Sequence, residues 1–219
     1  MITLEDVKKN KEVDTYIRKG DEYLSAMGFT EHSYRHLDLV SNISGNVLKH
    51  LGYNERDVEL ASIAGYLHDI GNVVGRHDHG TAGAVIAFNI LSKMGADPEE
   101  IAAIVSAIGN HEEEYGHPVS SISAALILGD KSDVHRSRVR NTEIATFDIH
   151  DRVNYAVQHS FLRVDEEQKA IILELEIDPE ISGIMEYFEI FLVRMVMCRR
   201  AAAFLGRNFW LMVNGAKLL

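Results

Sequence analysis

Apolar residues recur at helical spacing through the first two-thirds of the chain, and capping residues and glycines interrupt them at regular intervals. Each apolar run therefore has a start signal and a stop signal of its own. The expected helices cover residues 4–27, 33–51, 54–69, 82–94, 97–109 and 120–135. The pattern predicts a mainly α fold, with a bundle of about six helices in this part of the chain.

The last third of the chain changes to an alternation of apolar and polar residues, which is typical of strands. We expect two strands joined as a hairpin, then a long helix that starts at Asp178 and ends at Gly206, and then a short strand. The three strands are expected over residues 152–164, 169–177 and 209–213. The chain is thus predicted to have a helical domain over residues 1–145 and a small α+β appendage over residues 146–219.

Ligand-type side chains stand at or near the ends of successive apolar helices. His68 and Asp69 end the third apolar run, and Asp130 follows the last one. A buried carboxylate without a partner costs several kcal/mol, so it becomes neutral, is paired or binds a cation. His36, His79 and His111 lie at similar positions in other helices. Together the six residues predict a metal site, and their number suggests two metals.

Each of these residues also has a simpler interpretation. His68 alone can be a histidine favoured by the helix dipole, with Asp69 as a surface acid. The second His-Asp pair, His150-Asp151, lies in a polar stretch, and we expect it on the surface. The remaining isolated histidines are expected to be surface or capping residues: His32, His50, His117, His135 and His159.

Composition narrows the class of protein. The formal net charge of −11 argues against binding of long nucleic acid, which needs a basic surface. The single cysteine, Cys198, allows no disulfide within the chain, and the N-terminus has no apolar segment typical of a signal peptide. Charged residues interrupt the most apolar late segment, over residues 184–205, so no membrane span is expected. We expect a cytoplasmic protein, for which a homodimer is one possible assembly.

The order of these residues resembles the HD-domain superfamily of metal-dependent phosphohydrolases, over roughly residues 30–140. The phrases YLHDIGN, HGTAGA and ILGDKSD are similar to its di-metal branch. The resemblance implies an all-α core with His36, His68, Asp69 and Asp130 on a first metal. Asp69 would bridge to a second metal, which His79 and His111 would complete. Within the HGTAGA context His79 matches the family phrase better than His77 does.

Other branches of the superfamily fit less well or remain open. The cyclic-dinucleotide phosphodiesterase branch has Lys and His where this chain has Asn72 and Asn110. A di-iron oxygenase subgroup uses the same ligands. A mixed imidazole and carboxylate set suits Fe, Mn, Co, Ni or Zn and does not suit Ca or Mg alone. The resemblance implies two divalent transition metals, with iron as the first choice.

A run of basic residues, here called the basic run, follows Asp130 in this acidic protein: Lys131, His135, Arg136, Arg138 and Arg140. It can be a solvated helix end, or it can recognise phosphate. In the second interpretation Lys131, Arg136 and Arg138 bind the substrate. Lys131, Asp69 and His135 are then the predicted catalytic residues, and His135 would donate a proton to the leaving group.

These observations predict a metal-dependent phosphohydrolase. A metal-bound hydroxide would attack the phosphorus of a small phosphorylated substrate and split an ester or anhydride bond. The expected substrate is of the nucleotide type. Two alternatives remain: a di-iron oxidoreductase on the same scaffold, and a non-catalytic regulator that binds nucleotides.

Overall fold

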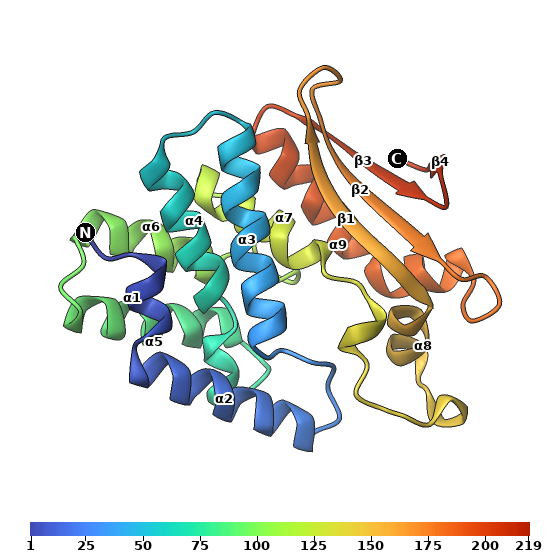
Figure 1. The fold of residues 1–219 in the computed structure, drawn as a ribbon, viewed down its shortest axis with the longest axis horizontal. Helices are drawn as coiled ribbons and strands as arrows, with labels where there is room; N and C mark the ends of the chain where they lie inside the picture. The colour runs from blue at the N-terminus through green and yellow to red at the C-terminus, as the bar shows by residue number, and fades with distance from the viewer.

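The computed structural model describes all 219 residues and joins a group of helices to a small twisted sheet (Figure 1). The helices come first along the chain and surround the segments that carry the predicted ligands. They are α1 (Leu4–Lys8), α2 (Lys11–Ala26), α3 (Tyr34–His50), α4 (Glu55–Leu67), α5 (His79–Lys93), α6 (Pro98–Gly109), α7 (Ser121–Ser132) and α8 (Ile149–Ala156). Three short 3₁₀ helices connect them: η1 (Ile70–Val73), η2 (Arg136–Arg138) and η3 (Ile144–Thr146).

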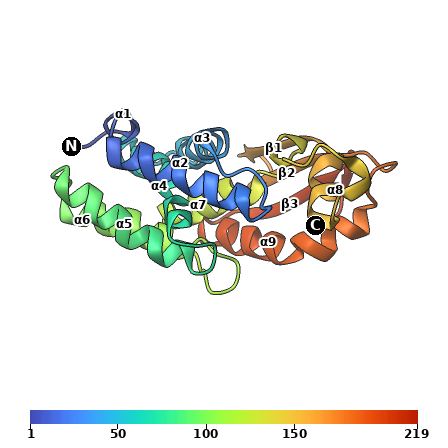
Figure 2. The ribbon, with the colours of Figure 1, turned by 90° about the horizontal axis from the view of Figure 1, so that it is seen from below.

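The sheet forms from the C-terminal part of the chain, in the order β1-β2-β3-β4. Its strands are β1 (Val157–Asp165), β2 (Ala170–Ile177), β3 (Asn208–Val213) and β4 (Ala216–Lys217). The β1–β2 and β3–β4 pairs are antiparallel, whereas β2 and β3 are parallel. A parallel pair needs a long crossover, which α9 (Ile184–Phe204) provides along one face of the sheet (Figure 2).

Small residues allow the central helices to approach closely. Helix α3 lies against α4 and α7 in the middle of the molecule. A Cβ on Gly65 of α4 would lie only 2.8 Å from the Ser41 Cα of α3. This contact therefore requires a glycine, and it brings the ends of the two helices that carry His36 and His68 together.

The predicted fold class, mainly α with a small C-terminal α+β part, is confirmed, but some element boundaries differ. The helix expected over residues 4–27 is two helices, because Lys9 ends α1 and the Asn10 side chain caps α2. The helix expected to begin at residue 82 begins at His79. The one expected to reach His135 ends at Ser132, because Asp133 leaves helical geometry with ψ of 78°.

The C-terminal boundaries differ for local reasons. The strand expected from Arg152 begins at Val157, because Asp148 caps α8 by accepting the Asp151 backbone N–H. The helix expected from Asp178 begins at Ile184, because residues 178–182 form a turn instead. In that turn the Asp178 carbonyl accepts the N–H groups of Ile181 and Ser182.

One hydrophobic cluster runs through both parts of the molecule. Its 47 buried residues include Leu67 of α4, Leu126 of α7, Leu173 of β2 and Met195 of α9. The division into domains at residue 145 stays a prediction. No helix is both long enough and apolar enough to cross a membrane.

Candidate metal centre

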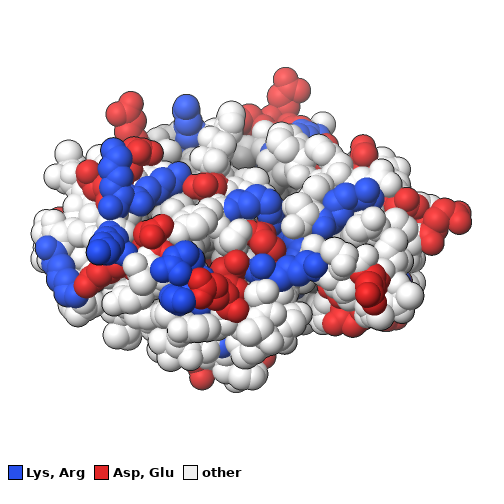
Figure 3. Space-filling view, turned by 60° about the horizontal axis from the view of Figure 1, so that its bottom comes forward, with Lys and Arg blue, Asp and Glu red and all other residues white.

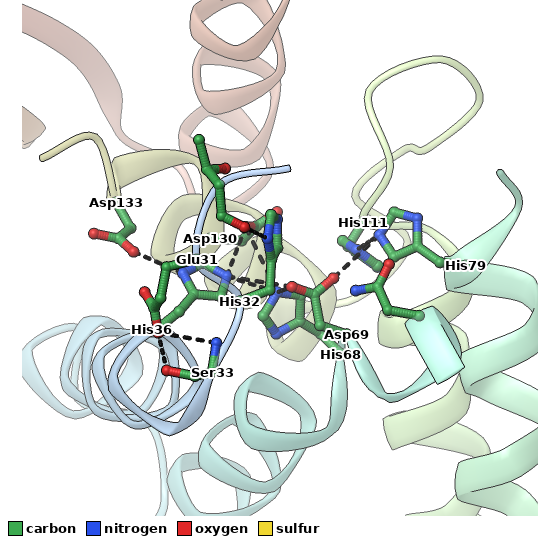
Figure 4. A network of polar contacts seen from close by, with 12 residues as sticks. Glu31, His32, Ser33, His36, His68, Asp69, His79, His111, Asp130 and Asp133 are labelled. Carbon is green, nitrogen blue, oxygen red and sulfur yellow. Dashed lines mark hydrogen bonds and ion pairs between the residues drawn. The ribbon is translucent and has the colours of Figure 1, made fainter. Parts of the chain in front are cut away.

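The structure brings the six predicted ligands together from five different parts of the helical bundle. His36 lies in the first turn of α3, His68 and Asp69 between α4 and η1, His79 at the start of α5, His111 just after α6 and Asp130 in the last turn of α7. All six are buried, with exposed fractions from 0% for His36 and His68 to 9% for Asp130. Figure 4 shows their side chains facing one another across the junction of these elements.

The backbone fixes the orientation of three of the four imidazoles. His68 Nδ1 donates to the Gly65 carbonyl at 2.8 Å, and His111 Nδ1 donates to the Ile108 carbonyl at 2.6 Å. His79 Nδ1 contacts the carbonyl of Arg76 at 3.0 Å in the same way. Because a carbonyl only accepts, each Nδ1 carries a proton, and in the neutral ring each Nε2 presents a lone pair. Histidines that bind a metal typically donate their other ring N–H to a carbonyl or carboxylate in this way.

The fourth imidazole is held by a carboxylate. His36 Nδ1 donates to Asp133 Oδ2 at 2.7 Å, and Asp133 is 1% exposed. The inward Nε2 atoms then meet in pairs: His36 and His68 at 3.2 Å, and His79 and His111 at 3.1 Å. Two lone pairs at such a distance repel unless a proton or a metal cation lies between them. The geometry therefore fits bound cations.

Asp69 lies between the two pairs of histidines, as Figure 4 shows. Its Oδ2 is 3.5 Å from His36 Nε2 and 3.4 Å from His68 Nε2, whereas its Oδ1 is 3.2 Å from His79 Nε2. Oδ2 is buried and accepts no hydrogen bond. A buried carboxylate oxygen without a donor is costly, and a metal ligand position explains it. The two oxygens of Asp69 thus face two separate sets of nitrogen donors.

Asp130 faces the first set with one oxygen and a cation with the other. Its Oδ1 lies 3.6 Å from the Nε2 atoms of both His36 and His68, and its Oδ2 accepts from Lys131 Nζ at 2.5 Å. Two groups of residues each bring three ligand atoms within 4.8 Å of one another. The first group is His36, His68 and Asp130, and the second is His68, Asp69 and His111. The mixed nitrogen and oxygen donors suit divalent transition metals.

The electrostatics of the cluster favour an additional positive charge. Burial opposes charge on Asp69 and Asp130, but His68 beside Asp69 and Lys131 beside Asp130 outweigh it and hold the pKa of both carboxyl groups well below the usual range. Burial likewise disfavours charge on His68, yet the two carboxylates raise its pKa to about 10. His111 has no such support, and burial lowers its pKa. Divalent cations at this position would supply the charge that the carboxylates attract.

Lys131 lies at this cluster, as the sequence predicted for a catalytic or phosphate-binding residue. It is 3% exposed and its Nζ lies 3.0 Å from Glu113 Oε1 as well as beside Asp130. The charges of Asp130 and Glu113 outweigh burial and raise the pKa of Lys131. Its ammonium is therefore committed to two carboxylates of the protein. The predicted catalytic role of Lys131 stays a prediction.

A cavity of about 350 Å³, here called the side cavity, lies beside the metal centre. Its lining residues come from the loop before α3, from η2, α8 and α9, and from the turn after η1: Met27, Gly28, Phe29, Thr30, His32, Arg76, Arg138, Asp148, His150, Asp151, Asn154, Phe191 and Arg194. Arg76 Nη1 is 3.6 Å from Asp69 Oδ1, and the His32 ring is 5.6 Å from the His36 ring. These contacts join the cavity to the cluster of ligands.

The basic run divides between this cavity and other parts of the structure. Arg138 lines the cavity, but its guanidinium already donates to the carbonyls of Asp133 at 3.0 Å and Glu31 at 3.1 Å. His135 and Arg136 are not among the lining residues. His135 Nε2 contacts the Gln158 carbonyl at 3.2 Å, so its proton points toward β1 and away from the cavity. The structure thus gives no support to His135 as the proton donor.

Arg136 is likewise placed outside the cavity. Its guanidinium lies 5.2 Å from the centre of the Tyr155 ring on α8. The sequence cannot distinguish these residues, because Arg136 and Arg138 are two positions apart and a 3₁₀ turn sends their side chains in different directions. The substrate-binding roles of Arg136 and Arg138 stay predictions.

The sequence reasoning missed several residues at the site. His32 is buried rather than on the surface, and its Nε2 accepts from Arg138 while its Nδ1 donates to the Thr30 carbonyl. Burial and the charge of Arg138 lower its pKa, so the ring is neutral. The available signal was the sequence HSYRH, in which His32 stands four residues, or about one helical turn, before His36. Arg76 and Arg194 gave none, because no motif surrounds them.

The second His-Asp pair lies away from the metal cluster: His150 is exposed and Asp151 is half-buried. His150 and Asp151 belong to neither group of converging ligand atoms. Both line the side cavity from the start of α8. Their expected exclusion from the metal site and the expected surface position of His150 agree with this placement, whereas the sequence did not indicate that both residues line a cavity.

Comparisons with known proteins agree with the fold and the ligand pattern. An HD domain family model matches residues 30–152, which include all six predicted ligands. An uncharacterized protein of Methanocaldococcus jannaschii is 26% identical over 210 residues, covering 85% of this chain and 80% of that protein. Ribonuclease Y of Lawsonia intracellularis is 33% identical over 104 residues, covering 47% of this chain but only 18% of that enzyme.

One solved structure is also similar in part. A predicted HD superfamily hydrolase from an uncultured Thermotogales bacterium matches with a TM-score of 0.46 at 24% identity. The match covers 57% of this chain and 68% of that one.

Proposed function

The chain belongs to the HD-domain superfamily of metal-dependent phosphohydrolases, and we propose that it uses two divalent metals to hydrolyse a phosphate ester or anhydride of a small, nucleotide-type substrate. The observation that carries this proposal is the position of Asp69. Its two oxygens face two sets of histidine nitrogens, at 3.2–3.5 Å. A carboxylate shared in this way is the typical bridge of a two-metal site.

When bound, the metals would supply an activated water and a Lewis acid for the phosphoryl oxygens. The protein's own contribution is to hold the four imidazoles in one tautomer through Gly65, Ile108, Arg76 and Asp133, with their Nε2 atoms inward. Lys131 neutralises the outer oxygen of Asp130. Because these supports already exist around the ligands, little reorganisation is needed at the moment of reaction.

The side cavity supports a phosphorylated substrate. Three arginines line it, and Arg138 donates both of its terminal nitrogens to protein groups. Arg76 lies beside Asp69, and Arg194 pairs through its Nε with Glu113 Oε1 at 2.9 Å, so both keep terminal N–H groups for a ligand. Arginine forks match phosphate oxygens. We therefore propose Arg76 and Arg194 as phosphate-binding residues. Arg194 comes from α9, outside the residues that match the family model.

The similarity to ribonuclease Y favours a second candidate, a phosphodiesterase that acts on RNA. The net charge of −11 counts against long nucleic acid. On the face in Figure 3, basic and acidic side chains are interspersed, without a continuous basic track. We therefore favour a small substrate. A homodimer stays a prediction.

Metal content and turnover test the proposal together. We expect protein purified without added metal to contain about two transition-metal ions per chain, and to release phosphate from an aryl phosphate and from nucleotides. Asp69→Ala should lose both properties. Oxygen consumption with a mixed-valent iron signal, and no phosphate release, would establish the oxidoreductase instead. Nucleotide binding without any turnover would indicate a regulator.

A further inference from the structure

Two chemically different groups of side chains line the side cavity. Arg76, beside the metal centre, lies within 3.6 Å of Asp69, and Arg194 stacks over the Phe191 ring at 4.6 Å. The second group comes from the start of α8 and consists of its N-cap Asp148 together with Asp151 and Asn154. A ligand that fills this cavity would therefore meet both cations and oxygen acceptors.

The acceptors at the start of α8 have capacity to spare. Asp148 uses one oxygen to cap the Asp151 N–H at 2.8 Å, which leaves the other free. Asp151 receives only a long contact of 3.4 Å from Asn141 Nδ2. Asn154 is buried, and its amide nitrogen donates to the His150 carbonyl at 2.8 Å. Its carbonyl oxygen receives no donor from the protein. These oxygens can accept from the hydroxyl groups of a ligand.

Apolar side chains complete the lining of the cavity. Met27 and Phe29 come from the loop before α3, and Phe191 comes from α9. The volume of about 350 Å³ lies at the lower end of the range for small-molecule sites. It suits one nucleotide-sized molecule, with an anionic group at the arginines, apolar surface at these apolar side chains and hydroxyl groups at the carboxylates.

We propose that Asp151, together with Asn154, binds the ribose hydroxyls of the substrate and makes the site selective for a ribonucleotide over its 2′-deoxy counterpart. Acidic side chains bind ribose hydroxyls in this way in dinucleotide sites. A site that hydrogen-bonds a hydroxyl leaves its own acceptor unpaired when the hydroxyl is missing, and this discriminates strongly. The proposal rests on the proposed function, because it takes the phosphate to lie at the metal centre.

The test is calorimetric binding of the four ribonucleoside 5′-monophosphates and their 2′-deoxy forms, to chelator-stripped and to metal-loaded protein. Wild type should bind at least one ribonucleotide about tenfold or more tightly than its deoxy form. Asp151→Asn should bring that ratio close to one, while affinity for the deoxy form changes little. The matched control is Glu143→Gln, which removes one exposed carboxylate shortly before α8 and lies outside the cavity lining.

The outcomes separate this proposal from the proposed function. Equal affinity for ribo and deoxy forms in every pair would overturn the proposal, as would an unchanged ratio in the folded Asp151→Asn protein. Release of phosphate from an aryl phosphate, which has no ribose, tests the hydrolase independently. If that activity persists while the ribo preference is absent, only the assignment of Asp151 fails. If ribo-selective binding occurs without any phosphate release, only the hydrolase fails.

Discussion

Asp133 supports a metal ligand without being one, and its replacement by asparagine tests how much that support contributes. Its Oδ2 accepts from His36 Nδ1 at 2.7 Å and from Arg35 Nη2 at 2.9 Å, and its Oδ1 accepts from Arg35 Nη1 at 3.3 Å. These donors outweigh the effect of burial and hold the pKa of Asp133 far below its usual range. The carboxylate is therefore an anion that keeps the His36 proton on Nδ1.

Asp133→Asn should weaken metal binding in either orientation of the new amide. If the amide oxygen faces His36, the tautomer survives, but the negative charge is lost and the amide NH₂ meets Arg35 Nη1. If the NH₂ faces His36, the imidazole proton must move to Nε2, which then has no lone pair for a metal. Loss of such outer partners typically costs 10–100-fold in metal affinity, or about 1.4–2.8 kcal/mol.

The assay is competition for Mn²⁺ or Fe²⁺ against a chelator of known affinity, on wild type and variant. Asp38→Asn is the matched control, because it also replaces an aspartate by asparagine. Asp38 lies on α3, the helix of His36, but pairs with Lys8 at 2.8 Å instead of with a predicted ligand. Asp133→Asn should lower affinity by 10-fold or more, and Asp38→Asn should not. A folded Asp133→Asn protein with wild-type affinity would refute the orienting role of Asp133.

Further predictions concern the ligands, the arginines and the second His-Asp pair. His68→Ala and Asp130→Ala should each lose metal, measured by elemental analysis. Arg194→Ala should raise KM for a phosphorylated substrate about tenfold with unchanged metal content. Arg138→Ala should instead lower the free energy of unfolding by about 2–4 kcal/mol in denaturant titrations, because the buried Asp133 carbonyl and the part-buried Glu31 carbonyl both lose their donor. His150→Ala should retain its full metal content. Loss of metal in this variant would mean that His150-Asp151, and not His68-Asp69, belongs to the metal site.

The six predicted ligands could be found from sequence because each stands at the end of an apolar helix. His68-Asp69 follows a run that ends at Leu67, and Asp130 follows a run that includes Leu126. Such positions place a polar group at the edge of a core, where it needs a partner. The structure brings all six together, which makes the pattern of apolar runs and helix ends informative about the site as well as the fold.

The side cavity could not be found in the same way. Arg76, His32 and Arg194 stand in three separate segments, and only the packing of α9 against α7 and of the loop before α3 brings them to one place. The segment that begins α8 misled for a different reason. Alternation in residues 152–156 is compatible with a strand, but the Asp148 cap favours a helix there. A local cap outweighs a short alternating pattern.

Gly71 has two roles, one in ending a helix and one in the packing of η1 against α5. In the sequence it is a stop signal after His68-Asp69. In the structure a Cβ there would collide with the His79 carbonyl oxygen and lie 2.5 Å from the Gly83 nitrogen. The absence of a side chain therefore lets η1 lie directly against the first turn of α5. That contact sets the distance between Asp69, which precedes η1, and His79, which begins α5. The link between the two sets of ligands thus depends on backbone packing, at a position where sequence reasoning sees only a helix end.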